Sequence, residues 1–94
     1  MVLVTFTFDV HAEDQETFIQ NVDEMKAFWR NQGIDFSLYR DQTQQSRFLQ
    51  LLRTDRTVDE ITQLIQSNPK AKAVFESIRS VAGRVSISFL DRVV

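Results

Sequence analysis

The sequence contains no cysteine, one histidine, one proline and two glycines. Without cysteine the chain has no disulfide, no cysteine-ligated zinc or iron–sulfur site and no thiol nucleophile, which fits a reducing compartment. One imidazole and two glycines are too few for a Ser–His–Asp set, a glycine-rich phosphate loop or a metal-spaced histidine cluster. We therefore expect no metal site and no cofactor, and the sequence assigns no catalytic residue.

An excess of charge of one sign is also missing. The 11 basic and 13 acidic residues give a formal net charge of -2, whereas nucleic-acid-binding domains gather lysine and arginine on one surface. No apolar run approaches the roughly 20 residues of a membrane-spanning helix, and the N-terminal segment lacks the features of a signal peptide. We expect one cytoplasmic domain over residues 1–94, with neither a nucleic-acid nor a membrane partner.

Four segments show the alternation of apolar and polar residues that is typical of half-buried strands. Between the first two, large apolar residues recur at helical spacing from Phe18 to Trp29, which predicts one helix over residues 12–32 that ends at Gly33. The second and third segments are close enough to form a hairpin. The four predicted strands are residues 2–10, 34–40, 47–53 and 85–93.

Two helix starts lie between the third and fourth predicted strands. Thr57 and Glu60 form a capping-box pattern, in which each side chain accepts a hydrogen bond from the other residue's backbone N–H. Asn68 followed by Pro69 ends this helix and caps another, because Asn caps well and Pro at the first helical position loses no useful N–H. We expect a second helix in two pieces, which ends at Gly83.

The element order is therefore β-α-β-β-α-β, that of an α+β, ferredoxin-like domain with a four-stranded antiparallel sheet and its helices on one face. A domain of this size buries only about 60% of the surface of its unfolded chain, so a partner surface would add stability. Trp29 falls in register with the apolar helix positions and is expected to pack in the core. The predicted helix-covered strand positions are Val4, Phe6, Phe8, Ile34, Phe36, Leu38, Leu49, Leu51, Val85, Ile87 and Phe89.

The opposite strand positions are too apolar for a solvated face and too polar for a dry core. A bare apolar patch usually marks a binding surface. We expect two copies to stack these faces into a homodimer, with a small-molecule chamber lined by hydroxyls, an amide and a phenol. The apolar positions on this face are Leu3, Leu52 and Leu90, and the predicted ligand-binding residues are Thr5, Thr7, Ser37, Tyr39, Phe48, Gln50, Ser86 and Ser88.

Together with the element order, several stretches carry a family resemblance: the strand 2–10, the helix with Phe18, residues 48–53 followed by 57–61, and residues 67–75. They make nearly the whole chain similar to the dimeric α+β barrel superfamily. Within it, the chain resembles the antibiotic-biosynthesis-monooxygenase-like group, which includes cofactor-independent quinone-forming oxygenases and heme-degrading enzymes. The resemblance implies a homodimer that binds a small molecule. Two functions stay open: a monooxygenase-like enzyme, or a non-enzymatic binding or interaction module on the same fold.

The heme-degrading members of that group carry an Asn on the first strand, a Trp after the third strand and an iron-ligating His in the last helix. The nearest positions here are Thr5 or Thr7, Arg53 or Thr54, and Phe75. None of them matches the family residue. The resemblance therefore implies the fold of this group, and we expect this chain to bind no heme.

Four residues have competing interpretations. His11 is the only side chain with an unperturbed pKa near neutrality; we read it as a solvated or capping residue of a turn, with a general-base or metal role as the alternative. Tyr39 and Gln50 are either ligand contacts or polar groups of the dimer interface. Phe48 would imitate the stacking aromatic of an RNA-recognition domain, but residues 46–51 lack the glycine and second aromatic of that signature.

Overall fold

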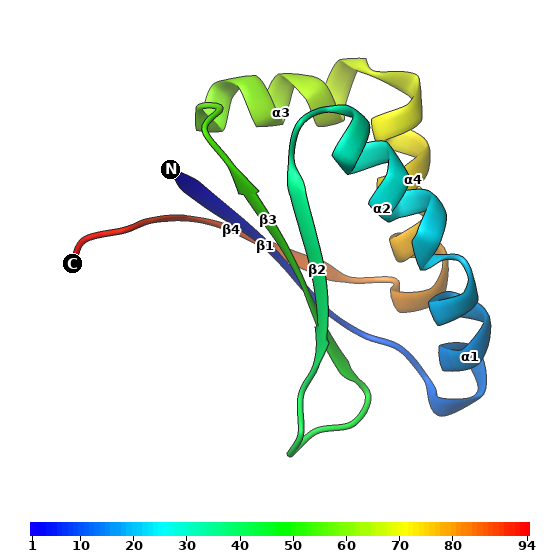
Figure 1. The fold of residues 1–94 in the computed structure, drawn as a ribbon. Coiled ribbons are helices and arrows are strands. Elements are labelled where there is room, and N and C mark those ends of the chain that lie inside the picture. The colour runs from blue at the N-terminus through cyan, green and yellow to red at the C-terminus, as the bar shows by residue number, and fades with distance from the viewer.

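The computed structural model describes all of residues 1–94 and has four strands and four helices (Figure 1). None of the helices has the length and hydropathy that a membrane crossing requires. The expected split of the second helical region is confirmed, whereas the first region also consists of two helices. The elements are β1 (Val2–Asp9), α1 (Ala12–Gln20), α2 (Val22–Asn31), β2 (Asp35–Arg40), β3 (Arg47–Thr54), α3 (Val58–Ser67), α4 (Pro69–Ala82) and β4 (Val85–Asp91).

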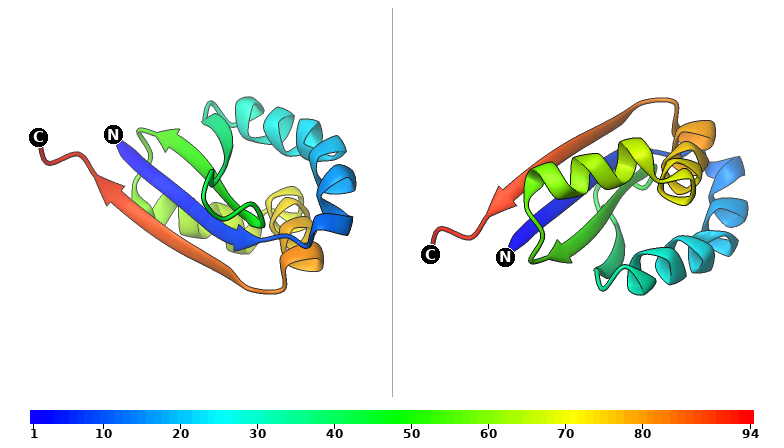
Figure 2. Two further views of the ribbon diagram at one scale, coloured as in Figure 1. Left: turned by 90° about the horizontal axis from the view of Figure 1, so that it is seen from below. Right: turned by 90° about the horizontal axis from the view of Figure 1, so that it is seen from above.

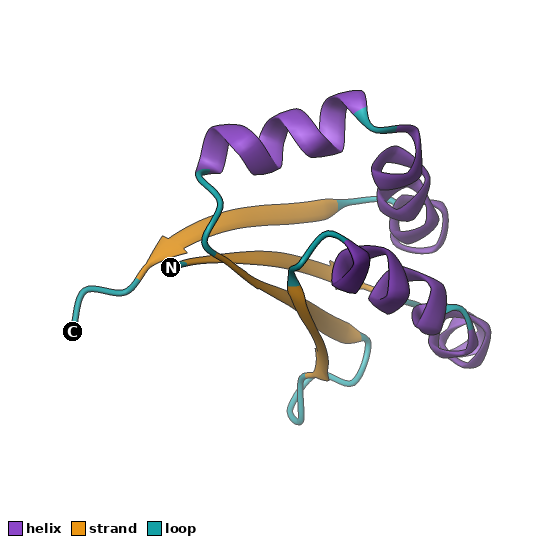
Figure 3. Cartoon of the chain, turned by 45° about the horizontal axis from the view of Figure 1, so that its top comes forward, coloured by secondary structure: helices purple, strands orange, loops and turns teal.

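The four strands form one antiparallel sheet in the order β2-β3-β1-β4. The helices lie together on one side of this sheet, and its other side, called the open face below, carries no helix (Figure 3). This arrangement is the predicted α+β ferredoxin-like fold. The two chain termini lie at the same end of the sheet, far from α1 (Figure 2).

The predicted caps of α3 and α4 are present. The Thr57 hydroxyl accepts from the Glu60 backbone N–H at 3.2 Å, and the Glu60 carboxylate accepts from the Thr57 backbone N–H at 3.2 Å. The Asn68 side-chain oxygen accepts from the backbone N–H groups of Lys70 at 2.9 Å and Ala71 at 3.2 Å. These bonds satisfy N–H groups that a helix start otherwise leaves without a partner, so the start of each helix is encoded locally.

The predicted single helix over residues 12–32 is interrupted at Asn21. This residue has φ -91° and ψ -3°, and the ψ angle departs from the helical value of about -42°. Its N–H is shared between the carbonyl oxygens of Thr17 at 3.3 Å and Phe18 at 3.1 Å, a pattern common at helix ends. The break lets Phe18 of α1 and Met25 of α2, each 3% exposed, both reach the core.

The two faces of β3 are the reverse of those predicted. Phe8 pairs with Phe48, Phe6 with Gln50 and Val4 with Leu52, and residues directly opposite each other in an antiparallel pair point to the same face. The side chains predicted to face away from the helices therefore lie under them, where all three are at most 2% exposed. Leu49 and Leu51, predicted to be core residues, lie on the open face instead.

The core explains why β3 adopts this register. The rings of Phe8, Phe18 and Phe48 form a cluster with centroid distances of 5.5 to 6.2 Å, within the range in which aromatic pairs add to the energy of burial. Placing Leu49 inward in place of Phe48 would break this cluster. Trp29, 2% exposed, packs edge-on against Phe28 as a core residue, as predicted.

Candidate functional site

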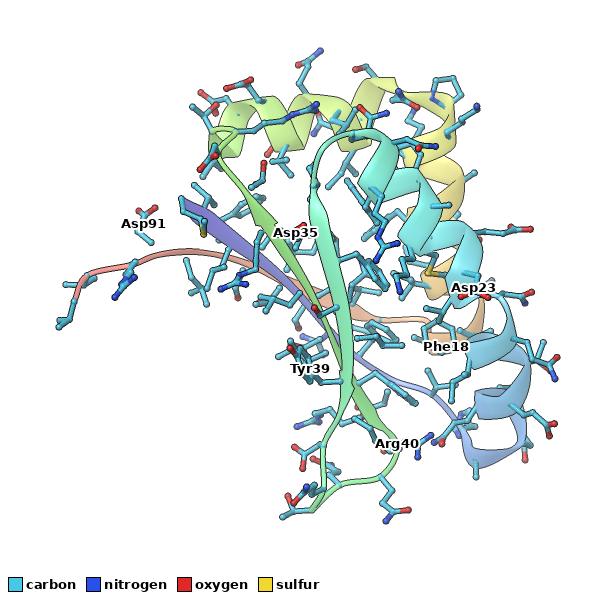
Figure 4. The ribbon with its side chains drawn as sticks, viewed as in Figure 1. Phe18, Asp23, Asp35, Tyr39, Arg40 and Asp91 are labelled. Carbon is cyan, nitrogen blue, oxygen red and sulfur yellow. The ribbon has the colours of Figure 1, made fainter.

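The open face holds six of the eight predicted ligand-binding residues. The register places Thr5 and Thr7 of β1 opposite Ser88 and Ser86 of β4, so these four hydroxyls form a continuous stripe. Tyr39 of β2, 55% exposed, lies on the side of the sheet away from the helices (Figure 4). The six residues on this face are Thr5, Thr7, Ser37, Tyr39, Ser86 and Ser88.

An apolar stripe runs beside the hydroxyls. Leu49 and Leu51 of β3 lie opposite Thr7 and Thr5, respectively. Near the chain termini the face continues with Leu3 and Leu90, which are paired with each other, and Leu90 is 47% exposed. The face thus combines leucines with hydroxyls, and the mixed composition that the sequence predicted is present although the leucines are partly different ones.

Two grooves flank the side chain of Arg47 at the hairpin end of the open face. One, of about 270 Å³, is lined by residues that include Thr7, Tyr39 and Phe48. The other, of about 360 Å³, is lined by residues that include Thr7, Ser86 and Arg84. The grooves share Thr7 and Arg47, so they bring Thr7, Tyr39 and Ser86 together. Phe48 also borders the first groove, although its side chain is 2% exposed on the helix-covered face. Thr5, Ser37, Gln50 and Ser88 line neither groove.

Charged side chains close this end of the open face. The Arg47 guanidinium contacts the carboxylate of Asp9, with Nε to Oδ1 at 3.3 Å and Nη2 to Oδ2 at 3.4 Å. Both side chains are about half exposed, at 41% and 52%, and an exposed ion pair of this kind adds little stability. Arg47 and Arg84 are not among the predicted ligand-binding residues. In the observed register of β3, Arg47 lies on the same face as Leu49, the open face. A prediction with this register would have found Arg47.

Asp41 organises the hairpin between β2 and β3. Its Oδ1 accepts from the Thr43 hydroxyl at 2.8 Å, the Thr43 backbone N–H at 2.8 Å and the Gln44 backbone N–H at 3.2 Å. These bonds favour the ionised carboxylate, so they lower the pKa of Asp41, with the Thr43 hydroxyl as the largest cause. The nearby Arg47 acts in the same direction. The loop that borders the first groove is therefore held by a charged acceptor.

Gln50 does not face the open side of the sheet. Its side chain is 1% exposed on the helix-covered face, and its cross-strand neighbours there are Phe6 and Leu38. Neither its amide nitrogen nor its amide oxygen has a hydrogen-bond partner, and the indole nitrogen of Trp29 has none either. An unpartnered buried polar group costs about 1–3 kcal/mol. The amide is thus a local source of instability in the core rather than a contact in a chamber at the open face.

Another cleft, about 340 Å³, lies between α1, α2 and α4. Phe18 and Met25 belong to its lining together with Ser77 and Ser80. Each of these serines donates its hydroxyl proton to a backbone carbonyl of α4 at 2.9 Å. None of the predicted site residues lines this cleft.

His11 is exposed and precedes α1 as its N-cap residue, but its side chain makes no capping hydrogen bond. It lines neither groove beside Arg47. No three His, Cys, Asp or Glu side chains converge in a way that could hold a metal ion. The solvated-turn reading of His11 agrees with this position.

Similarity to known proteins is visible in the fold rather than in the sequence. No protein-family model matches the sequence, and no curated protein matches it. In contrast, the structure is similar over 99% of this chain and 99% of the other chain to an antibiotic biosynthesis monooxygenase, with a TM-score of 0.79 at 12% identity. The fold is that of the antibiotic biosynthesis monooxygenase-like proteins.

Two further structures with this monooxygenase-like fold have been provisionally assigned as antibiotic biosynthesis monooxygenases. The one from Deinococcus radiodurans has a TM-score of 0.79 at 18% identity, over 98% of this chain and 92% of that chain. The one from Nitrosomonas europaea has a TM-score of 0.78 at 8% identity, over the full length of both chains. At such identities the likeness concerns the fold, and function must be argued from the site.

Proposed function

We propose that the chain is a small-molecule-binding protein that acts as a homodimer, with two copies stacked through their open faces and the ligand held between them. The observation that supports this most directly is the bare open face, where Leu90 and Tyr39 are 47% and 55% exposed. Contiguous exposed apolar surface of this kind usually marks an interaction site. A second copy supplies a surface of matching composition, since a two-fold axis brings like faces together.

The hydroxyl stripe supports a ligand chamber rather than a dry interface. Covering Thr5, Thr7, Ser86 and Ser88 would remove their water, and a buried hydroxyl without a hydrogen-bond partner is unfavourable. Strands of a rigid sheet hold these hydroxyls in fixed positions, and the leucines of β3 lie beside them. An apolar surface with a few fixed polar groups is the usual composition of a small-molecule site.

The homodimer is tested by sedimentation at micromolar concentration, where the dimer is expected at twice the protomer mass of 11.0 kDa. Leu90→Asp on the open face should shift the protein to monomer, because stacking would bury the new carboxylate. Ile19→Asp is the matched control, since Ile19 is similarly exposed, at 44%, but lies on α1. A wild-type monomer, or equal effects of the two substitutions, would refute the stacked homodimer.

A monooxygenase-like reaction is the enzymatic form of this proposal, and a non-enzymatic binding module is the alternative. The grooves contain one phenol, Tyr39, and no imidazole, so proton transfer would depend on Tyr39 or on the substrate itself. Dioxygen uptake in the presence of a hydroquinone separates the two forms. Uptake that rises with protein concentration and falls in Tyr39→Phe supports the enzyme, and binding without uptake supports the module.

A further inference from the structure

The groove between β1 and β4 carries an uncompensated positive charge. Its lining includes two guanidinium groups, Arg47 and Arg84, and one carboxylate, Asp9. Asp9 forms an ion pair with Arg47, and the other ion pair of the chain joins Arg79 to Glu76, so Arg84 has no carboxylate partner. The groove therefore matches a ligand group with a single negative charge.

Two hydroxyls line the same groove beside these guanidinium groups. Thr7 and Ser86 are direct partners across β1 and β4, and both line the groove. Side chains directly opposite each other in an antiparallel pair have Cβ atoms about 4.5–5.5 Å apart. Two such hydroxyls are close enough to donate to the same planar acceptor, such as the two oxygens of a carboxylate.

We infer that this groove binds the carboxylate of an organic acid, an assignment that rests on the proposed small-molecule function and names its ligand class. Arg84 supplies the charge, and Thr7 and Ser86 supply the donors. Charge-assisted hydrogen bonds from arginine suit a carboxylate because the planar guanidinium can offer two N–H groups at once. A doubly charged phosphate fits less well, because Asp9 would repel its second charge.

The apolar part of the acid lies in the neighbouring groove. Both grooves share Thr7 and Arg47, so they adjoin, and the second is lined by Tyr39 and Leu49. Its volume of about 270 Å³ is sufficient for a single ring. Covering the open face with a second copy would lower the local dielectric and strengthen the contact between Arg84 and the carboxylate.

Benzoate and its neutral analogue benzamide test this inference on the full-length protein. Titrations followed by the backbone N–H signals of Thr7 and Ser86 should show benzoate binding about tenfold more tightly than benzamide, the difference expected for one charge-assisted hydrogen bond. Arg84→Gln should remove this preference and leave benzamide unchanged. Arg53→Gln, at the opposite end of the open face beside Leu3 and Asp35, is the control and should have no effect.

Equal affinities for the two probes, no binding of benzoate at millimolar concentration, or an unchanged preference in Arg84→Gln would each overturn the inference. Sedimentation of the same samples separates this failure from that of the homodimer. Benzoate selectivity in a monomeric protein would leave the carboxylate site standing and remove the stacked chamber. If Arg84→Gln instead dissociates a dimer and leaves the benzoate preference intact, Arg84 is an interface residue and the inference is wrong.

Discussion

Gln50→Met is expected to make the protein more stable. Methionine has nearly the volume of glutamine and is flexible enough to fill the same space between Phe6 and Leu38. The substitution removes two buried atoms, the amide nitrogen and oxygen, that have no hydrogen-bond partner. Replacing an unsatisfied polar group by an apolar one of similar shape removes its desolvation cost and leaves no cavity.

The magnitude follows from the cost of an unpartnered group. At about 1–3 kcal/mol for each unsatisfied buried group, and with some relaxation of the amide, the free energy of unfolding should rise by about 1–3 kcal/mol. The total for a domain of this size is roughly 5–14 kcal/mol, so the gain is large in proportion. A change of about 1 kcal/mol corresponds to a shift in Tm of about 4–8 °C for a domain of this size.

Urea unfolding followed by fluorescence measures this change, because Trp29 is the only tryptophan and is buried in the same layer between sheet and helices. The midpoint should rise with an unchanged m-value. Protein concentration is held constant, since dimerisation would stabilise the folded state. Gln66→Met, at an exposed position of α3, is the control and should change stability by less than about 0.5 kcal/mol.

A loss of stability in Gln50→Met would refute the reasoning. It would mean that the Gln50 amide is hydrogen-bonded in solution, to water or to a bound molecule, and that methionine removes those bonds. A gain in both Gln50→Met and Gln66→Met would also count against it, because the effect would then not depend on burial.

Two further predictions concern the helix cap and the hairpin. Thr57→Ala should lower the free energy of unfolding by about 1 kcal/mol, because it removes the side-chain half of the capping box of α3, whereas Thr62→Ala, inside the same helix, should cost less; equal losses would show that the cap is not the cause. The lowered pKa of Asp41 means that its ionised form stabilises the folded hairpin. This contribution is present above the unfolded pKa of Asp and is lost as pH falls through the lower folded value. NMR titration of the Asp41 carboxyl should therefore give a pKa below that of an unstructured Asp, and Thr43→Ala should raise it.

Local sequence determined several elements of the fold. The alternation in β1 and the caps at Thr57 and Asn68 depend on residues within one strand or one helical turn, and the structure contains them as predicted. The split of the second helical region follows from Asn68 and Pro69 for the same reason. The break at Asn21 escaped prediction because Phe18 and Trp29 keep helical spacing on both sides of it, so the apolar pattern shows no interruption.

Only tertiary structure decided which face of β3 is covered. The segment Phe48-Leu49-Gln50-Leu51-Leu52 has large apolar residues in both registers, so alternation cannot distinguish its faces. Pairing with β1 and the ring cluster of Phe8, Phe18 and Phe48 select the observed register. This register buries Gln50 and places Leu49 and Leu51 on the open face.

In the candidate site, too, local sequence determined one part and tertiary structure the other. Alternation in β1 and β4 correctly assigned Thr7 and Ser86 to one face, since each strand has a single clearly apolar side. The groove that these residues form with Arg47 and Arg84 could not be read from the sequence, because the two arginines are far apart in the chain. They approach each other only because β3 and β4 both pair with β1, and that strand order is set by packing across the whole domain.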